Sequence, residues 1–285
     1  MEDLEKNIIL NALNEDLLDG SDVTSECLIP REHKSSFELL VNEDAILAGL
    51  SAFKNTFLTF DSTLRVDSGF QDGDEIKAAQ VIAAVSGNTI NILKCERTAL
   101  NLTSHLSGIA TLTRKLVDLI KHTKATLLDT RKNTAGLRYL EKKAVLSGGG
   151  KNHRFNLTEM VLIKDNHISF TKNIKEAVSK TRKSYGEKYK IEIEVSNLQE
   201  LKEAINTDVD LIMFDNWDVN SLKDGIKLVP NKIKTEASGQ ITPHNIKAYA
   251  ESGVDFISTS YMIKNAQWID FSLNALKSAF APCLK

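Results

Sequence analysis

The chain has 285 residues, of which 42% are hydrophobic and 26% charged, with a formal net charge of −2 at pH 7. These values are typical of a folded globular protein, and without a basic stripe they argue against a nucleic-acid-binding or scaffold protein. No apolar run approaches the roughly 20 residues that span a bilayer, and the acidic N-terminus lacks a secretory signal, so we expect no membrane partner and a cytoplasmic location.

The three cysteines are widely separated, at Cys27, Cys95 and Cys283. Their number is odd, and their spacing matches neither a metal site nor a redox pair. We therefore expect free thiols in a reducing compartment.

The N-terminal third predicts a small domain that combines helices with short strands. Aliphatic residues three or four positions apart predict an amphipathic helix over residues 2–18. Short apolar runs separated by polar turns then predict strands. These runs cover residues 36–42, 45–50, 56–60, 62–66 and 77–85. A long helical pattern follows at 89–121, and Gly108 within it is expected to form a joint.

From residue 125 onward, strand-like and helix-like segments alternate. The strand-like runs cover residues 125–130, 160–166, 190–195, 209–216, 232–239 and 254–260. Such alternation predicts βα units and a parallel sheet. Because the units lack a GxGxxG fingerprint, we favour a barrel over a dinucleotide-binding sheet.

Residues 129–167 stand out because they combine positive charge with glycine. They hold eight Lys or Arg and four Asp or Glu, a net charge of +4 in a chain of −2. A local concentration of cations predicts a pocket for a small anion rather than a general affinity for polyanions. Three of these cations have the spacing of an ordinary solvated helix face, namely Arg138, Lys142 and Lys143. We assign a second group to the pocket because its members adjoin a predicted strand or the triple glycine; they are Arg131, Lys132, His153 and Arg154.

Functional side chains in a (β/α) barrel gather at the carboxyl ends of the strands. The predicted ends carry cations at two strands, acids at three, and hydroxyl or glycine residues at the last two. In chain order, the polar residues are Thr130, Arg131, Lys132, Lys164, Glu192, Glu194, Asp215, Asn216, Glu236, Ser238, Gly239, Gln240, Ser258, Thr259, Ser260 and Tyr261. The small residues at the last two ends predict phosphate binding through backbone N–H groups.

The acids at the middle strands predict a second half of the site. Glu194 and Asp215 are positioned to face the cations across the barrel mouth, where carboxylates hold sugar hydroxyls or Mg²⁺. Alternatively, one of them only pairs with Lys164. Glu192 and Glu194 point to the same face of their strand, so alternation does not choose between them, and Glu236 is a further candidate.

Several segments in a fixed order resemble one enzyme family. The segment DTRKNTAGLRYLEKKAVLSGGGKNHRFNLTEMVLIKDNHI closely resembles the core of quinolinate phosphoribosyltransferase, also called nicotinate-nucleotide pyrophosphorylase (carboxylating). The likeness continues through EDLLDGSDVTSE, ERTALNLTSHLSGIAT, IEIEV, IMFDN, EASGQIT and GVDFIS.

The resemblance implies an α/β protein with two domains. They are an N-terminal α/β sandwich at 1–106, onto which a segment at about 270–285 packs back, and an open (β/α) barrel of about six strands at 107–285. It implies that quinolinate and phosphoribosyl pyrophosphate react, with Mg²⁺, to give nicotinate mononucleotide, pyrophosphate and CO₂ in NAD biosynthesis. It also implies a homodimer, with further assembly left open.

The resemblance also implies residue roles. The residues matched to the quinolinate pocket are Arg131, Lys132, His153, Arg154 and Lys164, with Arg97 entering from the other subunit. Arginine suits a dicarboxylate because its fork binds a carboxylate through two parallel hydrogen bonds. Glu194 and Asp215 match the acids that hold the ribose hydroxyls and the metal region. Lys132, Lys164, Glu194 and Asp215 are the residues expected to act in catalysis.

Three positions depart from the family pattern. Ala135 stands where the family has the proline of TPGLR. Gln240 replaces the last glycine of SGG, and Ser260 replaces the glycine of SVGAL. The latter two changes fall in the predicted phosphate loops.

Two alternative enzyme classes are compatible with this pattern. One is a related phosphoribosyltransferase with another acceptor, such as a molybdenum-transport-associated relative or a nicotinate-using enzyme. The other is a Schiff-base aldolase barrel that uses Lys132 or Lys164.

Overall fold

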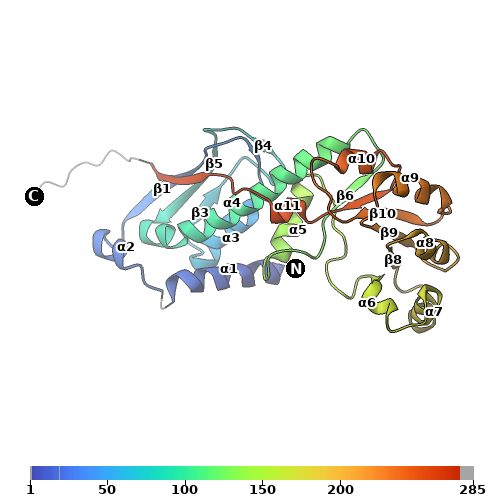
Figure 1. The fold of residues 1–285 in the computed structure, drawn as a ribbon. Helices are drawn as coiled ribbons and strands as arrows, with labels where there is room; N and C mark the ends of the chain where they lie inside the picture. The colour runs from blue at the N-terminus through green and yellow to red at the C-terminus, as the bar shows by residue number, and fades with distance from the viewer. Residues whose placement is uncertain (1, 19, 277–285) are drawn as a thin grey trace, which may run out of the picture. The chain divides into compact units, whose positions relative to one another are not determined.

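The computed structural model describes residues 2–18 and 20–276. The chain divides into two compact units, whose helices and strands are labelled in Figure 1. Unit 1 contains the chain up to Leu112, residues 134–149 and the segment from Asn265; unit 2 contains 113–133 and 150–264. The domain limits at 106 and 107 stay a prediction. Among the described residues, no helix combines the length and apolarity needed to cross a membrane.

Unit 1 is built on a four-stranded antiparallel sheet with the order β12-β1-β5-β3. Its strands are β1 (Lys34–Val41), β3 (Arg65–Asp67), β5 (Val81–Asn88) and β12 (Phe271–Ala275). Alternate residues of β1 are buried, which follows from the period of two in a strand that faces a core on one side. The pair β2 (Ala45–Ile46) and β4 (Glu75–Ile76) forms a separate small sheet. Residues 277–285, in the expected returning segment, lie outside the described part.

Helices complete unit 1, and one of them replaces an expected strand. They are α1 (Glu2–Leu17), α2 (Val23–Leu28), α3 (Leu50–Phe60), most of α4 (Thr89–Ile120) and α5 (Arg138–Ser147). The strand predicted at 56–60 is wrong, because these residues end α3. Phe53 and Phe57 lie one turn apart on its buried face and pack edge to face with ring centroids 5.1 Å apart. Burial of this face outweighs the strand propensity of the aromatic and β-branched residues.

The joint expected at Gly108 is also wrong, because α4 is continuous over 32 residues. A Cβ at Gly108 would lie 2.1 Å from the carbonyl oxygen of Gln267. The glycine therefore allows the backbone at Gln267 to approach the helix, rather than interrupting it. Cys27 and Cys95 are free thiols, as expected, whereas Cys283 lies outside the described residues.

Unit 2 is built on six parallel strands with the order β6-β11-β10-β9-β8-β7. The strands are β6 (Thr126–Leu128), β7 (Val161–Ile163), β8 (Ile191–Val195), β9 (Leu211–Asp215), β10 (Lys234–Ser238) and β11 (Phe256–Ser258). Unit 2 also contains the end of α4 and the helices α6 (Asp165–Ile168), α7 (Ile174–Tyr185), α8 (Leu198–Ala204), α9 (Val219–Leu228), α10 (Ile246–Ala250) and α11 (Tyr261–Lys264).

The expected α/β fold is confirmed. Strands β6 and β7 lie at the two ends of the six-stranded sheet, so the described barrel is open between them. A single parallel bridge from Leu128 to Lys151 extends the β6 edge. Because all six strands run in parallel, their carboxyl ends meet at one edge, where the polar residues singled out above are brought together.

Candidate active site

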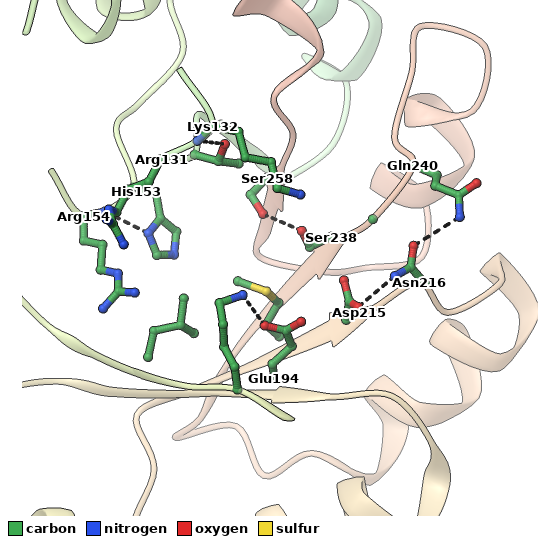
Figure 2. Close-up of a pocket in the computed structure, with 15 residues that line it drawn as sticks. Arg131, Lys132, His153, Arg154, Glu194, Asp215, Asn216, Ser238, Gln240 and Ser258 are labelled. Carbon is green, nitrogen blue, oxygen red and sulfur yellow. Dashed lines mark hydrogen bonds and ion pairs between the residues drawn. The ribbon is translucent and has the colours of Figure 1, made fainter. Parts of the chain in front are cut away.

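A polar pocket of about 530 Å³ opens at the carboxyl ends of the strands of unit 2 (Figure 2). Most of the predicted site residues line it. The lining residues are Thr130, Arg131, Lys132, His153, Arg154, Leu162, Lys164, Glu194, Met213, Asp215, Asn216, Ser238, Gly239, Gln240 and Ser258.

Cations form one side of the pocket. Arg131 and Lys132 follow β6, where the Thr130 hydroxyl accepts a 3.0 Å hydrogen bond from the Lys132 N–H. Arg154 comes from the loop beside β6 and donates from Nη1 to the carbonyl oxygen of Met160 at 3.0 Å. Partial burial and the nearby Arg131 lower the pKa of the Arg154 guanidinium from its usual high value, in that order of size. Such mutual repulsion is relieved when an anion binds between two cations.

Carboxylates from β8 and β9 form the opposite part of the pocket. Glu194 contacts the ammonium group of Lys164 at the end of β7, and its side chain is 15% exposed. Glu194 therefore forms the ion pair with Lys164 that was the alternative interpretation of these acids, and it also lines the pocket. Asp215 accepts a 2.7 Å hydrogen bond from the side-chain amide of Asn216, which holds one of its oxygens in place.

The segments that follow β9 and β10 each turn sharply and contact each other. Asn216 and Gln240 both adopt left-handed backbone conformations, with φ of 58° and 51°. The backbone N–H of Asn216 donates to the carbonyl of Ser238 at 2.9 Å. Gly239 has φ of 97°, and a Cβ on it would lie 2.3 Å from Oδ1 of Asn216. Gly239 is therefore required both by its backbone conformation and by this close approach.

The predicted residues at the end of β11 and just after it are placed differently from those at the end of β10. Ser258 lines the pocket and donates to the Ser238 hydroxyl at 3.1 Å. Thr259 is buried, and its hydroxyl donates to the carbonyl of Ile241 at 2.8 Å and accepts from the Tyr261 N–H at 3.1 Å. Thr259, Ser260 and Tyr261 do not belong to the described lining of the pocket. Thr259 instead supports the turn through these two hydrogen bonds.

A buried group lies deeper than the pocket wall. Nε2 of His153 is 2.9 Å from Oε2 of Glu192 and 3.7 Å from Oε2 of Glu236, and both glutamates are 0% exposed. Burial raises the pKa of Glu192 to about 7 and, together with the adjacent Glu192, that of Glu236 to about 8. The two carboxyls titrate as a pair, because each feels the charge of the other.

Comparison with known proteins decides the family. Residues 22–107 match the N-terminal domain and residues 109–274 the C-terminal domain of the quinolinate phosphoribosyl transferase family. The chain belongs to the quinolinate phosphoribosyltransferase family. This confirms the resemblance inferred from the sequence motifs.

Individual relatives agree over nearly the whole chain. It is 38% identical over 273 residues to a probable nicotinate-nucleotide pyrophosphorylase [carboxylating] of Bacillus subtilis, which covers 96% of this chain and 94% of the relative. A mitochondrial quinolinate phosphoribosyltransferase [decarboxylating] 2b of Nicotiana tabacum is 36% identical, with 94% and 81% covered. The solved structure of the nicotinate-nucleotide pyrophosphorylase from Francisella tularensis is 35% identical, with a TM-score of 0.89 and 97% of each chain covered.

The quinolinate phosphoribosyltransferase fold also places residues that the sequence argument did not select. Asn216 was noted at a strand end without a role, yet its amide contacts both Asp215 and the turn at Gly239. Its position directly after an acid at a strand end was the available signal. Leu162 and Met213 line the pocket without any polar signal that could have predicted it. Arg97 is exposed on α4 of unit 1.

Replacing Gly239 by Ala is expected to damage the turn in this quinolinate phosphoribosyltransferase. The added Cβ would meet Asn216, and the left-handed backbone disfavours any side chain, so we expect the free energy of unfolding to fall by about 3 kcal/mol. Urea unfolding measures this loss. Gly253→Ala is the control, because Gly253 also has positive φ but has open space around it. Equal losses in both variants would contradict the contact with Asn216.

Raising the pH from about 5 to about 8 is expected to destabilise the folded protein through the Glu192–Glu236 pair. Their folded pKa values of about 7 and about 8 exceed the ordinary glutamate value of 4.5, so the folded state holds protons that the unfolded state releases. Stability from this source is present below pH 4.5 and is lost as the pH rises, by at most about 1.4 kcal/mol per pH unit for each proton. Urea unfolding from pH 5 to 8.5 should give a flatter slope for Glu236→Gln than for wild type. Identical slopes would contradict the prediction.

Proposed function

We propose that the pocket of unit 2 binds quinolinate against its cations and phosphoribosyl pyrophosphate against its carboxylates and small-residue turn. The chain catalyses decarboxylating phosphoribosyl transfer to quinolinate, a step of NAD biosynthesis. The observation that supports the placement of the two substrates is the separation of charge within one pocket: Arg131, Lys132 and Arg154 on one side, Glu194 and Asp215 on the other.

The cationic side suits quinolinate because this substrate carries two carboxylates. Arg131 and Arg154 each offer a guanidinium that can bind a carboxylate through two parallel hydrogen bonds. Lys132 and Lys164 add compact charges nearby. Held there, the pyridine nitrogen faces the ribose, and positioning of the two reactants supplies much of the rate acceleration.

The reaction then needs little proton transfer from the protein. The pyridine nitrogen forms a bond to C1 of the ribose while the bond from C1 to pyrophosphate breaks. The alkylated nitrogen is positively charged. When the bond to the 2-carboxylate breaks and CO₂ leaves, the electron pair stays on the ring carbon beside that charge and then takes a proton from water. Fixed charges on the pocket wall stabilise the charge that develops at C1 and on the leaving group.

The carboxylate side fits Mg²⁺ and the ribose. Glu194 and Asp215 lie on adjacent strands at the pocket wall, and Mg²⁺ favours one or two carboxylates together with substrate oxygens. When bound, Mg²⁺ would neutralise the leaving pyrophosphate. The Glu194–Lys164 contact would loosen, which frees the Lys164 ammonium for the quinolinate carboxylate. The N–H groups of the turn at Gly239 would hold the 5-phosphate, with Gln240 at its rim.

We further propose a homodimer in which Arg97 of one subunit enters the pocket of the other, with further assembly left open. The exposed position of Arg97 on α4 supports this role. The cytoplasmic location stays a prediction. A Schiff base at Lys164 is disfavoured, because its side-chain nitrogen is already engaged by the carboxylate of Glu194.

The deciding experiment is quinolinate-dependent formation of nicotinate mononucleotide by the purified protein, with phosphoribosyl pyrophosphate and Mg²⁺. We expect stoichiometric release of CO₂ and pyrophosphate, and no product when nicotinate replaces quinolinate. Turnover of nicotinate without turnover of quinolinate would overturn the assignment in favour of a related phosphoribosyltransferase. Trapping of a substrate on Lys132 or Lys164 by borohydride would instead support the aldolase alternative.

A further inference from the structure

Glu192 and Glu236 lie close to the proposed quinolinate side but do not line the pocket. Both are fully buried, and Glu192 Oε1 and both oxygens of Glu236 lack a donor that meets hydrogen-bond geometry. Two buried carboxylates in contact are stable when they share one proton, because two full negative charges would repel each other without solvent to screen them. One donated O–H then satisfies an oxygen of the other carboxylate.

The His153 ring is held in one tautomer above this pair. The backbone N–H of Arg154 donates to Nδ1 of His153 at 2.8 Å, so Nδ1 carries no proton. The ring proton is therefore on Nε2, which donates to Oε2 of Glu192 at 2.9 Å. In this tautomer His153 provides a neutral, oriented ring.

The same tautomer argues against a metal ion at this cluster. Ligand atoms of His153, Glu192 and Glu236 lie within 4.8 Å of one another, which is close enough for a shared cation. A metal would require the lone pair of Nε2, but Nε2 carries the proton when Nδ1 accepts from Arg154. The cluster is better explained as a chain of hydrogen bonds.

This chain leads directly to a pocket cation. Arg154 is connected to Glu192 through the His153 ring, and the backbone N–H of His153 donates to Oδ1 of Asp129 at 2.9 Å. At its far end, the Arg154 guanidinium donates from Nη1 to the carbonyl oxygen of Met160, and Arg154 lines the pocket. We propose that Glu192, supported by Glu236, is a positioning residue that sets the Arg154 guanidinium for quinolinate through the His153 ring.

The inference rests on the proposed function, because it takes the bound anion to be quinolinate. Glu192 touches no substrate and acts only through His153 and Arg154. Two-point recognition of a carboxylate by Arg154 tolerates little displacement, so loosening the ring should weaken quinolinate binding selectively.

Paired substitutions of Glu192 test the proposal. Glu192→Gln keeps an acceptor for Nε2–H and can donate its amide to Glu236, so the KM for quinolinate should stay within about threefold of wild type. Glu192→Leu removes the acceptor, and the quinolinate KM and Kd should rise about tenfold or more. The KM for phosphoribosyl pyrophosphate should change less than about twofold in both variants.

Asp210→Asn is the matched control. Asp210 is a largely buried acid at the opposite ends of β8 and β9, where it accepts from Arg182 Nη2 at 2.7 Å and from the Ile191 N–H at 2.9 Å. Its substitution should lower the Tm without changing the quinolinate KM. An equal rise of both substrate KM values in Glu192→Leu, or an unchanged quinolinate Kd, would overturn the positioning role.

A measurement on wild type covers the case in which Glu192→Leu fails to fold. Two-dimensional ¹⁵N NMR of histidine-labelled protein should show His153 with a protonated Nε2 and an unprotonated Nδ1 at pH 7. A doubly protonated ring or the opposite tautomer would overturn the inference. Failure of the proposed function is distinct, because wild type would then neither bind nor convert quinolinate, whatever the His153 tautomer.

Discussion

Arg131→Ala is expected to raise the KM for quinolinate by about 100-fold, because the variant loses a charge-assisted, two-point contact with a carboxylate. The guanidinium lies at the pocket wall after β6, close enough to Arg154 to repel it. The KM for phosphoribosyl pyrophosphate should stay nearly unchanged, since the proposed site of that substrate lies on the other side of the pocket. Initial-rate kinetics with each substrate varied in turn measures both values.

Two controls separate geometry from charge. Arg131→Lys keeps the charge but loses the planar fork, so the quinolinate KM should rise by only about tenfold. Lys183→Ala removes an exposed positive charge from α7, at a distance from the pocket lining, and should leave both KM values as in wild type. If Arg131→Ala left the quinolinate KM unchanged, the assignment of the cationic side to quinolinate would be wrong.

Asp215→Ala is expected to lower kcat by about 100- to 1,000-fold, while the Kd for quinolinate stays close to that of wild type. The carboxylate is held by the Asn216 amide at 2.7 Å and lines the pocket from β9, where we propose that it acts on the ribose and would help to hold Mg²⁺. Losing one fixed electrostatic contact in a site of this kind weakens the stabilisation of the transition state by several kcal/mol and leaves the binding of the ground state unchanged. Single-turnover rates at saturating substrate measure the effect on the chemical step.

Asp215→Asn distinguishes charge from shape. The amide matches the size of the carboxylate but carries no charge, so its kcat should fall nearly as far as that of Asp215→Ala. A high Mg²⁺ concentration should partly restore Asp215→Asn if the acid acts through the metal. Full activity of Asp215→Asn would show that the carboxylate charge is not used.

Local sequence patterns were sufficient to predict the secondary structure where it is regular. Residues 190–195 read as a strand because β-branched residues alternate with acids, and β8 covers most of that range. They were insufficient at 56–60, where Phe57 faces a core that the local pattern does not contain. Gly108 was misread for the same reason. Its partner, Gln267, is far away in the chain.

The site shows the same division between local and tertiary information. Parallel strands necessarily bring their carboxyl ends to one edge, so the positions of Arg131, Lys164 and Asp215 followed from the strand pattern alone. The burial of each side chain did not follow from the strand pattern. Glu192 and Glu194 point to the same face of β8, yet Glu194 lines the pocket whereas Glu192 is fully buried beside Glu236.

The sequence by itself determined the alternation of strands and helices from residue 125 onward, the family and the kinds of side chain that meet at the barrel mouth, because short-range patterns carry this information. Only the tertiary structure decided which of those side chains face the cavity and which support it. Burial, tautomer and close approach depend on neighbours distant in the chain. His153 illustrates this: its ring lies between the backbone N–H of Arg154 and the carboxylate of Glu192, a placement that no spacing along the chain reveals.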